Sequence, residues 1–254
     1  MLFSSLVFLW LFLPVVFLVS RALPLRGQNA LLLAASLLFY AWGGPGYLPL
    51  MLVSITINWA GGLLLAPLNG RPRSGVLSVV ILADLALLGY FKYYTFAADT
   101  LNSLLHWPLL PAKEIALPIG ISFYTFQAIG YTVDVYRGSV SAEQRFWRYL
   151  LFISFFPQLV AGPIVRARDF IPQIRQNPVV VTREMFGTGV FLILTGLFKK
   201  AIISDYISLN FVDRIFDEPL LYSGFECLMG IYGYALQIYC DFSGYSDMAI
   251  GLAS

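Results

Sequence analysis

Long stretches without charged residues divide the chain and predict its membrane helices. Residues 1–20 carry no charge, and residues 27–70 carry none either. Because a helix needs about 20 apolar residues to cross the bilayer, the first stretch predicts one helix, whereas the second is too long for one. The Gly43–Gly46 cluster divides the second stretch, which predicts helices near 28–42 and 47–66 joined by a tight turn.

Basic residues mark the ends of several segments and set the predicted orientation. Arg21 and Arg26 follow the first apolar stretch, whereas a cleaved signal peptide carries its basic residues in front. The first stretch is therefore predicted to be a retained helix whose trailing, basic side lies in the cytoplasm. Charge and hydropathy also predict a span over 75–90 and, over 92–114, a looser segment made of an interfacial helix and a loop. They predict further spans over 115–133 and over 185–198, the latter ending at Lys199–Lys200. An amphipathic interfacial stretch over 202–217 and a last helix from Ser223 follow.

Two isolated ionisable residues interrupt the apolar pattern. Asp84 lies inside the predicted span 75–90. A carboxylate at membrane depth is costly unless it is paired or faces water, so Asp84 is either a residue of a buried pathway or a packing carboxylate that neighbouring side chains satisfy; we favour the second. His106, the only histidine, lies beside Trp107 and Pro108. Trp is typical of the headgroup level, so we expect an interfacial and not a catalytic role for His106.

One uncharged segment, residues 149–165, is flanked by arginines at both ends. The arginines of this most basic region are Arg137, Arg145, Arg148, Arg166, Arg168, Arg175 and Arg183. Positive charge on both sides disfavours a single full crossing of the membrane. Phe155–Pro157 and Ala161–Pro163 lie within the segment, and we predict a broken or re-entrant helix whose irregular backbone lines a protein cavity.

A polar motif lies in the last apolar stretch, at residues 239–251. Two pairs of polar residues are spaced four apart and share a helical face: Asp241 with Tyr245, and Ser243 with Asp247. Gly244 and Gly251 are seven apart and lie on one side of the helix, where small residues let a neighbouring helix approach closely. Both a functional site and a polar seam that only holds a helix bundle together fit this spacing.

Composition narrows the class of protein. Hydrophobic residues make up 59% of the 254 residues and charged residues 12%, about half the charged share of typical globular chains. This composition predicts a polytopic membrane protein. A net charge of +2, without a basic patch interleaved with aromatics, gives no sign of a nucleic-acid partner. Cys227 and Cys240 lie in apolar segments, which predicts buried thiols and neither a metal site nor a disulfide framework.

Three stretches, taken in order, resemble the membrane-bound O-acyltransferase family, and above all its bacterial alginate O-acetylation proteins and their peptidoglycan-acetylating relatives. They are Leu117–Phe126 with Asp134–Gly138, Phe155–Pro163 followed by Arg166, and Tyr239–Gly251. The resemblance runs over essentially the whole chain. It implies an all-α polytopic membrane protein, a bundle with broken or re-entrant helices around a tunnel. Residues 1–254 are then expected to form the N-terminal part of one longer domain.

The resemblance also implies an activity, a location and partners. Such enzymes move an acyl group, here expected to be acetyl from acetyl-CoA at the cytoplasmic side, to hydroxyls of an extracytoplasmic polysaccharide such as alginate. The expected location is the bacterial inner membrane, with periplasmic acetyl-transfer proteins as partners and no bound cofactor or metal. Arg137, Arg166 and Arg168 are candidates for binding the anionic donor, although membrane topology explains the same charges. Candidate tunnel-lining or helix-positioning residues are Asp241, Ser243, Tyr245, Asp247, Gly162 and Pro163.

No residue of this chain is assigned as catalytic. The family's catalytic histidine lies in a Trp-Arg-Arg-Trp-His type of motif that follows the polar motif by some tens of residues, and we expect it beyond Ser254. His106 matches no histidine of the family pattern. The 254 residues are therefore expected to be inactive by themselves. The alternative hypothesis is a non-catalytic membrane component, transporter-like or scaffolding, because function depends on the site rather than on the fold.

Overall fold

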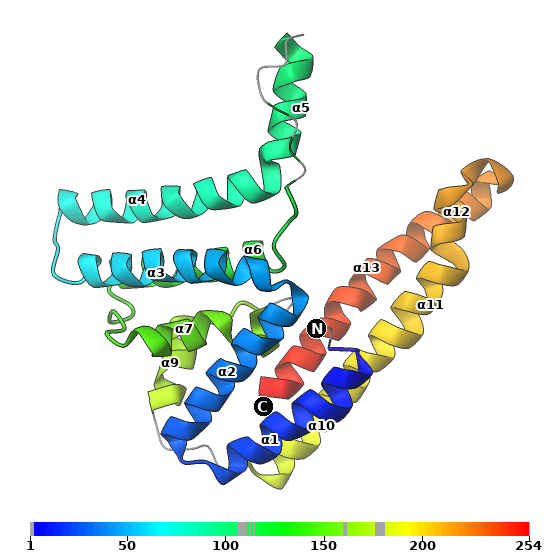
Figure 1. The fold of residues 1–254 in the computed structure, drawn as a ribbon. Helices are drawn as coiled ribbons and strands as arrows, with labels where there is room; N and C mark the ends of the chain where they lie inside the picture. The colour runs from blue at the N-terminus through cyan, green and yellow to red at the C-terminus, as the bar shows by residue number, and fades with distance from the viewer. Residues whose placement is uncertain are drawn as a thin grey trace. The chain divides into compact units, whose positions relative to one another are not determined.

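The computed structural model describes residues 3–105, 111, 113, 115–159, 162–175 and 181–253, and these residues form helices and no strand (Figure 1). The predicted all-α class is confirmed. The chain divides into two compact units. Unit 1 comprises residues 1–22, 161–163 and 178–254, and unit 2 comprises residues 23–160 and 164–177.

Unit 2 contains eight of the helices among the described residues. They are α2 (Leu25–Gly43), α3 (Leu48–Leu65), α4 (Arg71–Leu88), α5 (Tyr94–Leu105), α6 (Ile121–Arg137), α7 (Phe146–Ser154), α8 (Phe156–Leu159) and α9 (Ala167–Arg175). A single 3-10 turn, Pro45–Tyr47, separates α2 from α3, where the glycine cluster predicted a turn. Helices α3, α4 and α6 pack against one another, and Met51, Ile55, Tyr124 and Tyr131 are buried in their shared core.

The ends of α6 are set by glycines. Gly120 at its start has φ +73° and Gly138 at its end has φ +76°, a conformation that a Cβ disfavours. The Gly138 amide donates to the Val135 carbonyl at 3.1 Å, and the Ser139 amide donates to the Asp134 carbonyl at 3.0 Å. These bonds satisfy carbonyls at the end of the helix, so the local sequence determines where α6 stops.

Asp84 is a packing carboxylate at the junction of α3, α4 and α6. It is fully buried. Asn58 donates to both of its carboxylate oxygens, at 2.9 and 2.8 Å, and the Ser54 hydroxyl donates to one of them at 3.2 Å. Thr132 in turn donates to the amide oxygen of Asn58 at 2.8 Å. Neighbouring side chains thus satisfy Asp84, as the favoured interpretation of the sequence predicted.

The fourth helix is longer than the sequence predicted. Instead of ending near residue 90, α4 continues through a π-helical turn, Gly89–Tyr93, into α5, so that one helix runs from Arg71 to Leu105. The predicted end of the span near residue 90 is therefore wrong, whereas a helix is present up to Leu105 in the segment predicted to be an interfacial helix and a loop. The Lys92 ammonium group, in the π-helical turn, lies 5.3 Å from the centre of the Tyr93 ring. His106 lies outside the described residues.

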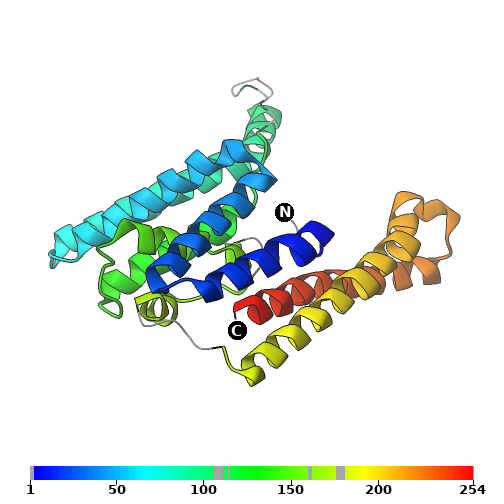
Figure 2. The ribbon, with the colours of Figure 1, turned by 60° about the horizontal axis from the view of Figure 1, so that its bottom comes forward.

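Unit 1 is built on a pair of antiparallel helices that lie side by side in both views (Figures 1 and 2). One is a continuous helix made of α10 (Arg183–Leu197), a π-helical segment (Phe198–Ser204), α11 (Asp205–Ile207), a second π-helical segment (Ser208–Val212) and α12 (Asp213–Asp217). The other is α13 (Gly224–Ala253). A shorter helix, the π-helical turn Phe8–Phe12 followed by α1 (Leu13–Ala22), belongs to the same unit.

The helix from Arg183 does not end at Lys199–Lys200, contrary to the prediction from charge. It runs on to Asp217 as one span-length helix, and residues 202–217 are its second half rather than a separate interfacial element. The two lysines were interpreted as a stop at the membrane surface. Their side chains have acidic partners, described below, which removes the reason for the helix to end there.

The local sequence at Ser223 and Glu226 determines where α13 starts. The Ser223 hydroxyl accepts a hydrogen bond from the Glu226 amide at 3.3 Å, and a Glu226 carboxylate oxygen accepts one from the Ser223 amide at 2.8 Å. This reciprocal pair is a capping box, and it starts the helix at the predicted position. Of the two free thiols, Cys240 is buried as predicted, whereas Cys227 is only half-buried.

Three helices of the described residues are long and apolar enough to cross a membrane. They cover Pro45–Leu65, Arg71–Leu105 and Arg183–Asp217, and the apolar helix Phe8–Ala22 is shorter. The predicted break within residues 149–165 is present, because α7 ends at Ser154 and α8 starts at Phe156 with Phe155 between them in a non-helical conformation. A tunnel and a re-entrant course through the bilayer stay predictions.

Candidate functional site

The polar motif of residues 239–251 lies on α13, at its closest approach to α10. A Cβ on Gly244 would lie 2.7 Å from the Gly196 carbonyl oxygen, and a Cβ on Gly196 would lie 2.5 Å from the Gly244 carbonyl oxygen. Two turns further along, a Cβ on Gly251 would lie 2.6 Å from the carbonyl oxygen of Gly189. The seven-residue spacing of Gly244 and Gly251 therefore marks a contact between helix backbones, as predicted.

Each of the two predicted polar pairs of the motif contacts its own lysine. Lys199 donates to the Ser243 hydroxyl at 2.9 Å and to the Asp247 carboxylate at 2.6 Å. Lys200 pairs with the Asp241 carboxylate at 2.6 Å, and its ammonium group lies 5.6 Å from the centre of the Tyr245 ring. The two faces defined by four-residue spacing thus meet two consecutive lysines of the neighbouring helix.

Lys200 also pairs with Asp205 on its own helix, at 2.7 Å. The π-helical segment Phe198–Ser204 contains both lysines, and such widened turns are frequent at functional sites. Charged side chains are tolerated within a candidate span when they pair with one another. The network of Lys199, Lys200, Asp241 and Asp247 therefore fixes the register of α10 against α13 and holds the motif side chains in place.

Removal of one lysine of this network should destabilise unit 1. We expect Lys199→Met to cost about 1–2 kcal/mol, because Asp247 keeps its charge without a partner. The figure is below the range for fully buried pairs, since the side chains of Lys199 and Asp247 are 27% and 22% exposed. Thermal unfolding in detergent measures the effect. The double variant Lys199→Met/Asp247→Leu should recover most of the loss. If the single and the double variant are destabilised equally, the ion pair between Lys199 and Asp247 is contradicted.

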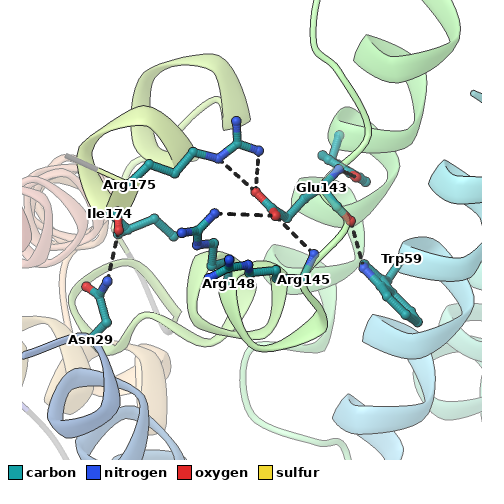
Figure 3. Close-up of polar contacts among 8 residues, drawn as sticks. Asn29, Trp59, Glu143, Arg145, Arg148, Ile174 and Arg175 are labelled. Atoms are coloured by element: carbon teal, nitrogen blue, oxygen red, sulfur yellow. Dashed lines mark hydrogen bonds and ion pairs between the residues drawn. The ribbon is translucent and has the colours of Figure 1, made fainter. Parts of the chain in front are cut away.

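In unit 2 a buried carboxylate, Glu143, contacts arginines of two later helices, α7 and α9 (Figure 3). Its side chain is 2% exposed and forms an ion pair with Arg175 of α9 through two of the guanidinium nitrogens. Its other oxygen lies 4.0 Å from a guanidinium nitrogen of Arg148 on α7 and accepts the Arg145 amide at 3.0 Å. The cluster connects the loop after α6 to α7 and α9.

The backbone of Glu143 is held as firmly as its side chain. Its amide donates to the Tyr131 hydroxyl at 2.8 Å. Its carbonyl accepts the indole N–H of Trp59 at 2.8 Å (Figure 3). Asn29 of α2 donates to the carbonyl of Ile174 at 2.9 Å, next to Arg175. Because α2, α3, α6, α7 and α9 all contribute a contact, the arginines occupy defined positions rather than a mobile surface.

The arginines form one wall of a cavity of about 710 Å³ in unit 2. Its basic lining consists of Arg26, Arg145, Arg148 and Arg175. A second cavity, of about 290 Å³, shares the last three of these arginines and is lined by Glu143. The arrangement is suited to binding an anion, because guanidinium groups offer paired donors to carboxylate or phosphate oxygens.

The donor-side arginines predicted from the resemblance lie elsewhere. Arg137 is exposed in the last turn of α6, and Arg166 is exposed before the start of α9. Arg168 is exposed on α9 and pairs with Asp169 at 3.6 Å. None of the three lines the two cavities described above, and their role in binding a donor stays a prediction.

The remaining predicted residues fall into two groups. Asp241, Ser243, Tyr245 and Asp247 are brought together at the lysines of unit 1, whereas Gly162, which is buried, and Pro163, which is exposed, lie in the non-helical stretch before α9. Within the described part of the chain no group of histidine, cysteine and acidic residues could hold a metal ion. The tunnel-lining role of these residues stays a prediction.

Sequence reasoning missed Glu143 as the centre of the arginine cluster and Lys199–Lys200 as partners of the motif. A signal for Glu143 was present: it is the one acidic residue between Arg137 and Arg166, in the most basic region of the chain. For the lysines the signal was their place in an apolar stretch that continues on both sides. Each pattern identifies a charged residue but does not predict which residue it contacts.

Span-length apolar helices and ion pairs inside them define the chain as an integral membrane protein. No protein-family model matches it. It is 39% identical, over 99% of its length, to the probable alginate O-acetylase AlgI of Azotobacter vinelandii, of which it covers 51%. It is 34% identical over 99% of its length to the peptidoglycan O-acetyltransferase of Helicobacter pylori, covering 53% of that protein, and 26% identical over 75% of its length to the teichoic acid D-alanyltransferase of Bacillus subtilis, covering 54%.

These similarities agree with the resemblance carried by the three motifs. The names and identities of these relatives are consistent with the membrane-bound O-acyltransferase family. It spans about half the length of the curated relatives it matches.

Proposed function

We propose that the protein containing this chain is an O-acyltransferase of the bacterial inner membrane. It transfers an acyl group, most simply acetyl, from acetyl-CoA at the cytoplasmic side to hydroxyls of an extracytoplasmic polysaccharide, alginate or another cell-envelope glycan. The single observation that carries the proposal is the 39% identity, over 99% of the chain, to a probable alginate O-acetylase. Periplasmic acetyl-transfer proteins are the proposed partners.

The reaction sets requirements that the chain meets only in part. The acceptor oxygen forms a bond to the acyl carbon, the bond from that carbon to the donor sulfur breaks, and the acceptor proton has to reach a base before the thiol leaves. Three acidic side chains already have partners. Asp84 accepts hydrogen bonds from Asn58 and Ser54, Asp247 pairs with Lys199, and Glu143 pairs with Arg175. We therefore assign no general base to these residues and propose positioning roles for them.

Complementation of an alginate-producing bacterium that lacks its own O-acetylase tests the proposal. Expression of the natural protein that contains this sequence should restore acetyl groups on the secreted polymer, measured by NMR of the purified polysaccharide. If the natural protein reaches the membrane and the polymer stays unacetylated, alginate is excluded as acceptor; if peptidoglycan of a matching deletion strain also stays unacetylated, the enzyme hypothesis fails and the transporter-like or scaffolding alternative takes its place.

A further inference from the structure

The arginines that line the cavity of about 710 Å³ in unit 2 carry more positive charge than the neighbouring Glu143 carboxylate balances. Arg148 and Arg175 share Glu143, whereas no carboxylate of the described residues pairs with the guanidinium group of Arg26 or Arg145. Four guanidinium groups against one carboxylate leave an excess of three positive charges. Such an excess in one cavity raises the local concentration of anions and favours a multiply charged ligand.

Two helices begin at the same cavity. α2 starts at Leu25 and α7 starts at Phe146, and Leu25, Arg26, Arg145 and Trp147 are all among the lining residues. Neither helix has a side-chain cap at its start. The first amides of a helix carry a partial positive charge and lack intrahelical partners, so both ends add donors for an anion to those of the arginines.

The positions of the arginines are fixed before a ligand arrives. Glu143 orients Arg148 and Arg175 through its two carboxylate oxygens (Figure 3). The guanidinium of Arg148 also lies 5.2 Å from the centre of the Trp147 ring. A guanidinium that is already held loses less conformational entropy when it binds. Arg26 and Arg145, which are exposed, stay available for direct contact with the ligand.

We propose that this cavity is a phosphate-binding site, with Arg26 and Arg145 as direct contacts and with Glu143 holding Arg148 and Arg175 in place. Planar guanidinium forks match phosphate oxygens in pairs, and the cavity volume lies in the range of small-molecule sites. Two sources supply this chemistry: the diphosphate of a soluble nucleotide-type acyl donor, which rests on the proposed function, and the headgroup of an anionic phospholipid, which does not.

Binding to the purified protein in nanodiscs tests the site and separates the two sources. In discs of phosphatidylcholine the probe is free coenzyme A, and its dissociation constant is measured by equilibrium binding. In discs that contain phosphatidylglycerol, native mass spectrometry after detergent release counts retained lipid. The test variants are Arg26→Gln and Arg145→Gln, which leave the Glu143 ion pairs intact. The matched controls are Arg71→Gln and Arg214→Gln, which remove the same charge at exposed positions that do not line the cavity.

A donor site predicts that each test variant binds coenzyme A at least tenfold more weakly than the parent protein, while both controls bind as the parent does. A lipid site predicts that the test variants lose retained phosphatidylglycerol, the controls keep it, and coenzyme A binding is weak in all five proteins. Either result supports a phosphate site. Unchanged binding of both probes in the test variants, equal losses in the controls, or no binding of either probe by the parent protein overturns it.

The two proposals fail in different experiments. If coenzyme A binding depends on Arg26 and Arg145 but no polymer is acetylated in the complementation assay, the phosphate site stands and the acyltransferase proposal falls. If the polymer is acetylated but the Arg26→Gln and Arg145→Gln variants bind both probes as the parent does, the enzyme stands and its phosphate site lies elsewhere. The melting temperatures of the variants should match that of the parent protein, which separates lost contacts from lost folding.

Discussion

Gly244→Ala should lower the melting temperature of the protein in detergent by about 5–10 °C, which corresponds to about 2–3 kcal/mol for a chain of this size. The added methyl group would lie 2.7 Å from the Gly196 carbonyl oxygen and 3.2 Å from the Lys200 amide nitrogen. These are backbone atoms, so relief requires α10 and α13 to move apart. The separation would also lengthen the contacts of both lysines with the motif.

Gly187→Ala is the matched control, because it makes the same chemical change on α10 with no atom within 4 Å of the new methyl group. At such a position alanine is favoured over glycine in a helix by roughly 1 kcal/mol, so this variant should melt at a slightly higher temperature than the parent. The two substitutions are thus expected to have opposite signs. A Gly244→Ala variant that melts as high as Gly187→Ala would show that the helices do not meet at Gly196 and Gly244.

Glu143→Ala should destabilise unit 2 by about 2–3 kcal/mol. The substitution leaves the guanidinium groups of Arg148 and Arg175 without their shared carboxylate, and removal of one member of a buried pair costs more than the pair contributes. The expected loss is below the full range for buried pairs because the Arg175 side chain is 39% exposed. Thermal unfolding in detergent gives the size of the effect, and limited proteolysis should show faster cleavage between α6 and α7.

The exposed pair of Arg168 and Asp169 provides the control for this second experiment. Its side chains are 55% and 60% exposed and lie 3.6 Å apart, so Asp169→Ala should change stability by less than about 1 kcal/mol. The double variant Glu143→Leu/Arg175→Met should recover part of the loss, because it removes both charges of the pair. Equal and small effects of Glu143→Ala and Asp169→Ala would contradict the central position of Glu143.

In both units, charged side chains are held by partners distant in the sequence. Lys199 meets Asp247 after 48 residues and Arg175 meets Glu143 after 32. The pairs connect helices that hydrophobic packing alone would let slide past one another. We therefore expect substitutions at these pairs to alter the packing of the helices and to lower stability.

The sequence by itself determined the features that depend on neighbouring residues. Gly120 and Gly138 set the ends of α6, Ser223 and Glu226 set the start of α13, and the four-residue spacing placed Asp241 with Tyr245 on one helical face. Each of these follows from backbone conformation or helical periodicity, which act over a single turn. The family motifs likewise stand in the sequence as continuous segments.

The tertiary structure alone decided which faces meet. Periodicity put Asp247 on a face with Ser243 but could not name Lys199 as its partner, and the same lysine was misread as the end of a helix because an unpaired charge ordinarily belongs at the membrane surface. Glu143 and the cavity of Arg26 and Arg145 came together only through the packing of α2, α7 and α9. A charged residue in an apolar segment indicates that it has a partner, but only the packing of distant segments determines which residue that partner is.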